Sequence, residues 1–266
     1  MASLEKLLVI SSEDKDNPTD SNSDFTVTLK ESYYTQNVLR VLVKEITVPN
    51  VFPNIRGTAY GSSQNNVLLF TDPSGQVVTM PEGQYLINSS NPLLDFTSIL
   101  EGLMTSITVA TISVSYDELT NKIVFEVAND GSPNITILAS SPMAKVLGIT
   151  EDLVVPATAT PTSPSGQVDL SGYSNVYIHS KEVADTHGID GDSGLIALVD
   201  PISLTDAPFG AYAYKQENDD ELASIVYEDV RNLSRLRIVL RDNLGNKLPI
   251  GTHTMNIVLK IYLSSG

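Results

Sequence analysis

The sequence predicts an all-β protein, a single jelly-roll β-sandwich that carries a small α/β insertion. Short runs of β-branched and other apolar residues recur along the chain, most clearly in VLRVLVKEITV at residues 38–48. Turn formers separate these runs at unequal spacings, and only one long stretch shows helical periodicity. Many short strands, unequal connections and few helices are typical of jelly rolls and related sandwiches. A chain of 266 residues with 41% hydrophobic residues is also long enough to bury the core of one such domain.

The first 24 residues are expected to form a flexible N-terminal arm. Residues 11–24, SSEDKDNPTDSNSD, are polar and rich in turn formers, and the apolar stretch LLVI before them is short. We therefore expect a first strand at residues 25–29, and one jelly-roll domain over residues 25–266. A membrane span needs about 20 apolar residues. We expect a soluble chain without a cleaved leader, because neither the start nor any later run meets that length.

The strand at residues 38–48 is expected to end at Pro49 and Pro53, because proline cannot donate a hydrogen bond to a ladder. A hairpin should follow it. Its strands, 67–71 and 77–80, flank Asp72-Pro73-Ser74-Gly75, which has proline and glycine at favoured turn positions.

The α/β elaboration is expected at about residues 81–150. Behind Asn91-Pro92, apolar residues fall near helical spacing and predict one amphipathic helix: Leu93, Leu94, Phe96, Ile99, Leu100, Leu103 and Met104. Strands should follow at residues 111–116, 122–127 and 135–138. A second short helix is expected at Pro142–Leu147, with Gly148 as its C-terminal cap. Residues 156–165, PATATPTSPS, then predict a long loop or linker.

The last hundred residues are expected to return to strands. The candidates are residues 175–179, 194–199, 224–227, 235–240 and 254–263. Residues 200–221 should form a long, partly acidic loop, and residues 241–247 a short one rich in turn formers.

Composition narrows the functional classes. The formal charge of −16, from 32 acidic and 16 basic residues, argues against direct binding of nucleic acid, which requires clustered lysine and arginine. We interpret the acidity as a solvated surface. The absence of cysteine excludes disulfides, thiolate metal sites and cysteine nucleophiles. No zinc-ligand set and no glycine-rich phosphate-binding motif is present, so we expect no cofactor and no metal.

One motif resembles an enzyme site. Gly191-Asp192-Ser193-Gly194 matches the GDSG sequence around the nucleophile of chymotrypsin-like serine proteases, whose triad also needs a histidine and a buried acid. The three histidines are His179, His187 and His253. His187 is only six residues before Ser193, and the other two lack the flanking residues of that family. We therefore expect no catalytic residue, and interpret the segment as a glycine-rich acidic loop.

Several oxygen-rich segments are weighed as cation sites. Asp185, Asp190, Asp192 and Ser193 supply hard ligands, but His187 and Ile189 interrupt the alternation that a calcium loop requires. A second acidic set comprises Asp14, Asp16, Asp20 and Asp24, and a third is the run Glu217-Asn218-Asp219-Asp220-Glu221. We interpret both as solvated segments first, and as cation or partner sites second.

The aromatic residues give little support to carbohydrate binding. They make up 6% of the chain and include no tryptophan. Tyr33, Tyr34, Tyr212 and Tyr214 are the candidates for a sugar platform, and packing in the core or an interface explains them equally well.

Seven segments together, in order, resemble one protein family. They are SDFTVTL, VLRVLVKEITVPNVFPNI, PEGQYLI, LTNKIVFEV, MAKVLGI, NVYIHSKEV and HTMNIVLKIYL. This pattern resembles the penton (minor capsid) proteins of virophages and of Maverick/Polinton-type viruses, which are single jelly rolls. The chain departs from the family at Phe52-Pro53-Asn54, where a Tyr-Asn pair is common, and at Ile149, where an aromatic residue is usual.

The resemblance implies a structural capsid protein of the virion, assembled inside the host cell. It implies a homopentamer at the five-fold vertices of an icosahedral capsid, in contact with neighbouring major capsid proteins. Contacts in such a ring are heterologous, with one face of a subunit against a different face of the next. The alternative is a viral receptor-binding or fibre-head β-sandwich module, for which a monomer or trimer is expected.

Overall fold

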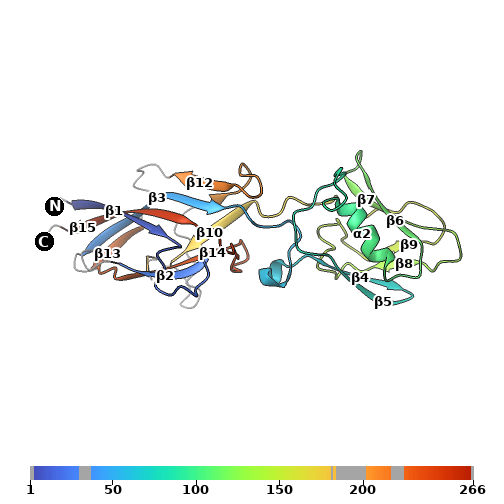
Figure 1. The fold of residues 1–266 in the computed structure, drawn as a ribbon, viewed down its shortest axis with the longest axis horizontal. Coiled ribbons are helices and arrows are strands. Elements are labelled where there is room, and N and C mark those ends of the chain that lie inside the picture. Colours follow the sequence, from blue (N-terminus) through green and yellow to red (C-terminus); the bar gives the residue numbers. More distant parts are fainter. Residues whose placement is uncertain (1–2, 30–36, 181, 184–201, 217–224, 265–266) are drawn as a thin grey trace. The chain divides into compact units, whose positions relative to one another are not determined.

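The computed structural model describes residues 3–29, 37–180, 182–183, 202–216 and 225–264 (Figure 1). The chain divides into two compact units. We call Met1–Phe52 together with Tyr173–Gly266 the sandwich unit, and Pro53–Gly172 the inserted unit. Each unit contains its own antiparallel sheets, which confirms the expected all-β class.

The sandwich unit is built from two antiparallel sheets (Figure 1). The first has the order β1 (Ser3–Ser11), β15 (Asn256–Ser264), β3 (Val38–Pro49) and β12 (Tyr212–Gln216), and β13 (Ile225–Arg231) also pairs with β3. We call it the five-stranded sheet. The second has the order β11 (Ile202–Ser203), β10 (Asn175–His179), β14 (Arg235–Arg241) and β2 (Asp24–Thr28).

The core of the sandwich unit follows the two-residue period of its strands. Along β15 every second residue is buried, including Ile257, Leu259 and Ile261, and the residues between them are half-buried. This alternation places one apolar face of the strand against the core and leaves the other face toward water. Strand β3, in the middle of the sheet, ends at Pro49, as the missing proline N–H predicts.

The expectation of a flexible arm is wrong for β1. Its nine residues pair with β15 in continuous antiparallel register, from Ser3 opposite Ser264 to Ser11 opposite Asn256. The local sequence does not reveal this strand, because the strand with which it pairs, β15, comes from the other end of the chain. The polar segment that follows is held by hydrogen bonds: the Lys15 Nζ donates to Asn22 Oδ1 at 2.7 Å, and Asp16 N donates to Thr26 O at 2.8 Å.

The inserted unit has two small sheets and one α-helix. A four-stranded sheet has the order β5 (Ser74–Thr79), β4 (Val67–Asp72), β8 (Ile135–Ile137) and β9 (Leu153–Val155). Strands β6 (Ile112–Asp117) and β7 (Lys122–Val127) form a hairpin, and the helices are η1 (Thr58–Ser63) and α2 (Phe96–Thr105). Buried Phe70, Phe96 and Phe125 belong to the core of this unit.

The inserted unit is larger than the elaboration expected at about residues 81–150. It begins at Pro53 and ends at Gly172, because β4 and β5 pair within this unit rather than with the sandwich. The expected second helix at residues 142–147 is a set of turns ending at Gly148, which has φ +72°. The expected strand at residues 194–199 lies outside the described residues.

The observed α2 starts later than its apolar pattern predicts. Asp95 is the N-cap, so Leu93 and Leu94 precede the helix and are exposed. Strand β12 falls in a segment expected to be loop, because its five residues carry no strong apolar alternation.

Candidate functional site

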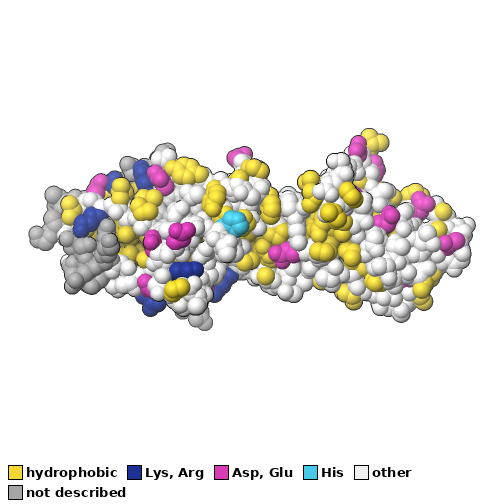
Figure 2. Space-filling model, in the orientation of Figure 1, with side chains coloured by type: hydrophobic (Ala, Val, Ile, Leu, Met, Phe, Trp, Pro, Cys, Tyr) yellow, Lys and Arg dark blue, Asp and Glu magenta, His cyan; other side chains and the backbone are white. Residues whose placement is uncertain are grey.

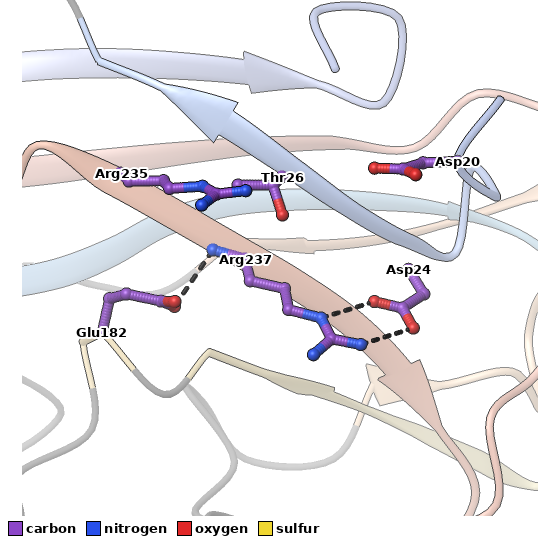
Figure 3. A pocket seen from close by; sticks show the side chains of 6 residues that line it. All are labelled: Asp20, Asp24, Thr26, Glu182, Arg235 and Arg237. Atoms are coloured by element: carbon purple, nitrogen blue, oxygen red, sulfur yellow. Dashed lines mark hydrogen bonds and ion pairs between the residues drawn. The ribbon is translucent and has the colours of Figure 1, made fainter. Parts of the chain in front are cut away.

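A polar depression lies on the solvent side of the second sheet of the sandwich unit (Figure 3). Its lining residues are Asp20, Asp24, Thr26, Glu182, Arg235 and Arg237. Strands β2 and β14 supply most of them, and Thr26 is directly opposite Arg237 in the ladder. Alternate residues of paired strands share one face, so the acidic and basic side chains of the two strands meet there.

Asp24 and Arg237 form the centre of this depression. The Arg237 Nε donates to Asp24 Oδ1 at 2.8 Å and the Nη2 donates to Oδ2 at 2.9 Å (Figure 3). The Lys247 Nζ also contacts Oδ2. The hydrogen bond from Arg237 is the main reason that the pKa of Asp24 is below its ordinary value. The same bond raises the pKa of Arg237. The pair is therefore fully ionised at neutral pH.

Neighbouring groups extend the network. Glu182 Oε2 accepts a hydrogen bond from the Arg237 backbone N at 3.0 Å, and the Arg235 Nε lies 4.0 Å from Asp16 Oδ2. Asp16 also accepts from the N and Oγ1 of Thr28, at 2.8 and 2.7 Å. The depression thus contains opposite charges that satisfy one another. These hydrogen bonds and ion pairs hold the segment before β2 against the sheet. The role that they support is structural.

The acidic set named from the sequence does not converge on one point. Asp14 accepts from Ser11 N at 3.1 Å, Asp20 accepts from Asn17 Nδ2 at 3.0 Å, and Asp16 and Asp24 serve different partners on β2 and β14. Within the part of the chain that the structure describes, no group of three or more histidine and acidic residues is arranged to hold a metal ion. Asp14 and Asp16 are exposed, as expected of a solvated segment, but hydrogen bonds tie the set to the fold and it does not form a free arm.

Other candidate residues lie apart from this depression or outside the described ranges. His179 is buried on β10, whereas His253 is exposed and its Nδ1 lies 3.1 Å from Ile250 O. The residues beyond the described ranges are Tyr33, Tyr34, Asp185, His187, Asp190, the Gly191–Gly194 motif and the run Glu217–Glu221.

Exposed apolar side chains mark both edges of the five-stranded sheet. On β1, Leu4, Leu7 and Val9 are 52%, 61% and 65% exposed, and on β12, Tyr212 and Tyr214 are 49% and 58% exposed. The two tyrosines are among the candidates named from the sequence, whereas the β1 residues are not. The sequence gives no clear signal for them, because LLVI is a short continuous apolar run, and the pairing with β15 is what identifies the strand.

Charged residues border the β1 edge. A second depression is lined by Glu5, Lys6, Leu7, Lys44 and Lys260. The Lys260 Nζ lies 2.9 Å from Glu5 Oε2, and the Arg40 guanidinium lies 4.1 Å from the centre of the Tyr262 ring. Figure 2 shows acidic side chains on both units of the face in view, whereas the basic side chains in view lie on the sandwich unit. The β1 edge therefore combines apolar side chains with neighbouring charged side chains.

No family model and no curated protein sequence matches the chain. The crystal structure of the selenomethionine-labelled mavirus penton protein is similar to this structure. The match covers 98% of this chain and 100% of that chain, with a TM-score of 0.47 and 11% sequence identity. A TM-score below 0.5 carries no argument about function. A function for this protein is therefore inferred from its own residues.

None of the helices in the described ranges combines the length and the apolar character that a membrane span requires.

Proposed function

We propose that this chain is a structural viral capsid protein, the penton (minor capsid) protein, which forms homopentamers at the five-fold vertices of an icosahedral capsid. Its partners in this role are further copies of itself and the neighbouring major capsid proteins, and its location is the virion. The proposal includes no enzymatic activity, and the GDSG motif has no catalytic part in it.

The segments that resemble penton proteins supply much of the framework of the sandwich unit. SDFTVTL contains β2, VLRVLVKEITV forms most of β3, NVYIHSKEV contains β10 and HTMNIVLKIYL contains most of β15. These strands come from both sheets. The other three segments, PEGQYLI, LTNKIVFEV and MAKVLGI, lie in the inserted unit, so the resemblance extends over strands and turns of both units.

The observation that carries the proposal is the apolar β1 edge. Strand β1 is nine residues long, and Leu4, Leu7 and Val9 are all more than half exposed on it. Long apolar edge strands promote association with another chain, and proteins that remain monomeric usually shorten, charge or cover them. A subunit that is completed by its neighbours in a shell has a reason to keep such an edge.

The mass of the purified protein in solution tests the proposal. Light scattering at several concentrations should give five times the chain mass of 28.7 kDa. A stable trimer would instead favour the alternative of a receptor-binding or fibre-head module. A chain that stays monomeric at every concentration would contradict homopentamer formation by the protein alone.

Localisation in particles is a second test. Gold-labelled antibody against the chain should mark the vertices of intact virions, because the proposed position is the five-fold axis. Uniform labelling over the capsid faces would contradict that position.

A further inference from the structure

We infer that neighbouring copies join head to tail through the five-stranded sheet, with β1 of one copy adding to β12 of the next. This inference rests on the proposed function, because it names the surfaces through which the copies associate. Three observations carry it: the direction of the unused backbone groups on each edge, the direction of the strands, and the side chains at the two edges.

The backbone of β1 has a free side among the residues that the structure describes. Ser12 N donates to Met255 O at 3.0 Å, and in an antiparallel ladder such hydrogen-bonded pairs recur at every second residue. Ile10 and Leu8 therefore bond to β15. The N–H and C=O groups of Glu5, Leu7 and Val9 point away from it.

Strand β12 also directs the backbone groups of alternate residues away from its partner. Asn50 N donates to Ala211 O at 2.7 Å, so Ala213 and Lys215 are the residues whose backbone groups face β3. Pro49, which has no N–H, is opposite Tyr212, as this register requires. The N–H and C=O groups of Tyr212 and Tyr214 therefore point to the other side, where the described ranges contain no paired strand.

The strand directions allow the sheet to continue between copies. β1 is antiparallel to β15, β15 to β3, and β3 to β12, so β1 and β12 run in opposite directions within one sheet. Placing β1 of one copy beside β12 of the next, with the sheets facing the same way, gives an antiparallel pair. Sheet edges join in this way in β-strand addition, where backbone hydrogen bonds supply much of the affinity.

The exposed side chains at the two edges lie on the same face of the sheet. Directly paired residues share a face, and one row across the sheet contains Val9, Val258, Glu45 and Gln216. Leu7 belongs to this face with Val9, and Tyr212 and Tyr214 belong to it with Gln216. At the junction, Leu7 would lie opposite Tyr214 of the next copy, and Val9 opposite Tyr212. Aromatic and aliphatic residues form favourable cross-strand pairs.

A head-to-tail contact fits these edges better than a contact between two β1 strands. A two-fold β1–β1 pair would cover one apolar edge and leave the β12 tyrosines exposed. The head-to-tail contact covers both edges with a single heterologous interface, the type that forms a ring when the rotation between copies closes.

Cross-linking tests the junction directly, because the chain contains no cysteine. We would prepare Leu7→Cys with Tyr214→Cys and Val9→Cys with Tyr212→Cys, each in one chain, together with the four single variants. Residues opposite one another in a hydrogen-bonded antiparallel pair have Cα atoms about 5.5 Å apart, within the range that disulfides span. Mild oxidation should give a ladder of covalent oligomers on a denaturing gel.

The controls define what overturns the inference. Leu119 is 97% exposed on the inserted unit, so Leu119→Cys with Tyr214→Cys should give no ladder. Efficient dimers from Leu7→Cys alone, without a ladder from the double variants, would indicate the β1–β1 contact and overturn the inference. Absence of cross-links from both double variants would overturn it as well.

Charge substitution provides an independent measurement. Leu7→Glu combined with Val9→Glu changes only exposed side chains, so the circular dichroism spectrum should be unchanged while the mass falls to that of the single chain, 28.7 kDa. The matched variant Leu119→Glu should keep the wild-type mass. A pentamer that survives both β1 substitutions would refute the junction but leave the proposed function standing, whereas a wild-type protein that never associates would contradict both the junction and homopentamer formation by the protein alone.

Discussion

Asp24 on β2 and Arg237 on β14 form a bidentate ion pair, although the two residues are 213 positions apart in the chain. The Asp24 side chain is only 15% exposed, and Arg237 reaches it diagonally across the paired strands. The contact joins the start of the sandwich to one of its last strands. Its strength should therefore be measurable in the stability of the sandwich unit.

We predict that Asp24→Asn destabilises the sandwich unit by about 1 kcal/mol at neutral pH, because it removes charge-assisted hydrogen bonds from a partly exposed pair. Urea unfolding followed by circular dichroism measures the change. Asp20→Asn is the matched control, since the Asp20 side chain lines the same depression but accepts from Asn17 within its own loop. An equal effect of the two substitutions would show that the ion pair adds nothing.

The same pair predicts a dependence on pH. The pKa of Asp24 is lowered in the folded protein, so the ionised carboxylate stabilises the fold above the ordinary carboxyl pKa of about 4. That contribution should disappear as the pH falls through the lower pKa of the folded state. The difference in unfolding free energy between wild type and Asp24→Asn should therefore shrink from pH 6 toward acid. A difference that stays constant would contradict the assignment.

We predict that Asp95→Ala destabilises the inserted unit by about 1–2 kcal/mol. Asp95 Oδ2 accepts from the N and Oγ of Ser98 at 2.9 and 2.6 Å, which caps α2. Burial opposes ionisation of Asp95, but the hydrogen bonds from Ser98, Thr97 and Ser89 outweigh it and lower the pKa. Hydrogen exchange of the α2 amides is the direct measurement. Leu93→Ala, at a 79% exposed site just before the helix, should leave exchange unchanged.

Truncation should destabilise the protein to very different extents at two neighbouring positions on β1. Ile10 is 1% exposed and Val9 is 65% exposed. Ile10→Ala should cost about 2–5 kcal/mol of stability through lost burial and a cavity, whereas Val9→Ala should cost less than about 0.5 kcal/mol. Thermal unfolding of the two variants compares them. Equal small effects would mean that β1 does not contribute to the core.

Gly148→Ala should destabilise the inserted unit more than Gly131→Ala. Both glycines have positive φ, +72° and +91°, so an added side chain strains the backbone at either position. At Gly148 the new Cβ would also lie 2.5 Å from backbone atoms of Gly166 and Gln167, whereas at Gly131 it would meet no atom within 4 Å. A lower melting temperature for Gly148→Ala than for Gly131→Ala is the expected result, and the reverse order would contradict the close packing.

The sequence by itself determined the strands whose residues alternate strongly. The bounds of residues 122–127 and 175–179 agree with β7 and β10, and β3 differs by one residue from its prediction. Alternating β-branched and apolar residues specify an extended, half-buried strand locally, without reference to a partner. Asp24 and the tyrosines of β12 were named from their residue types alone, as part of an acidic set and as a possible sugar platform, and the sequence did not reveal the residues beside them.

The tertiary structure alone decided which segments meet. β1 is a strand because β15 pairs with it from the opposite end of the chain, and β12 is a strand because β3 offers it an edge. The division at Pro53 and Gly172 and the contact between Asp24 and Arg237 also depend on long-range pairing. Hydrogen bonds between distant strands leave little trace in a local pattern, because any extended segment can occupy a free edge.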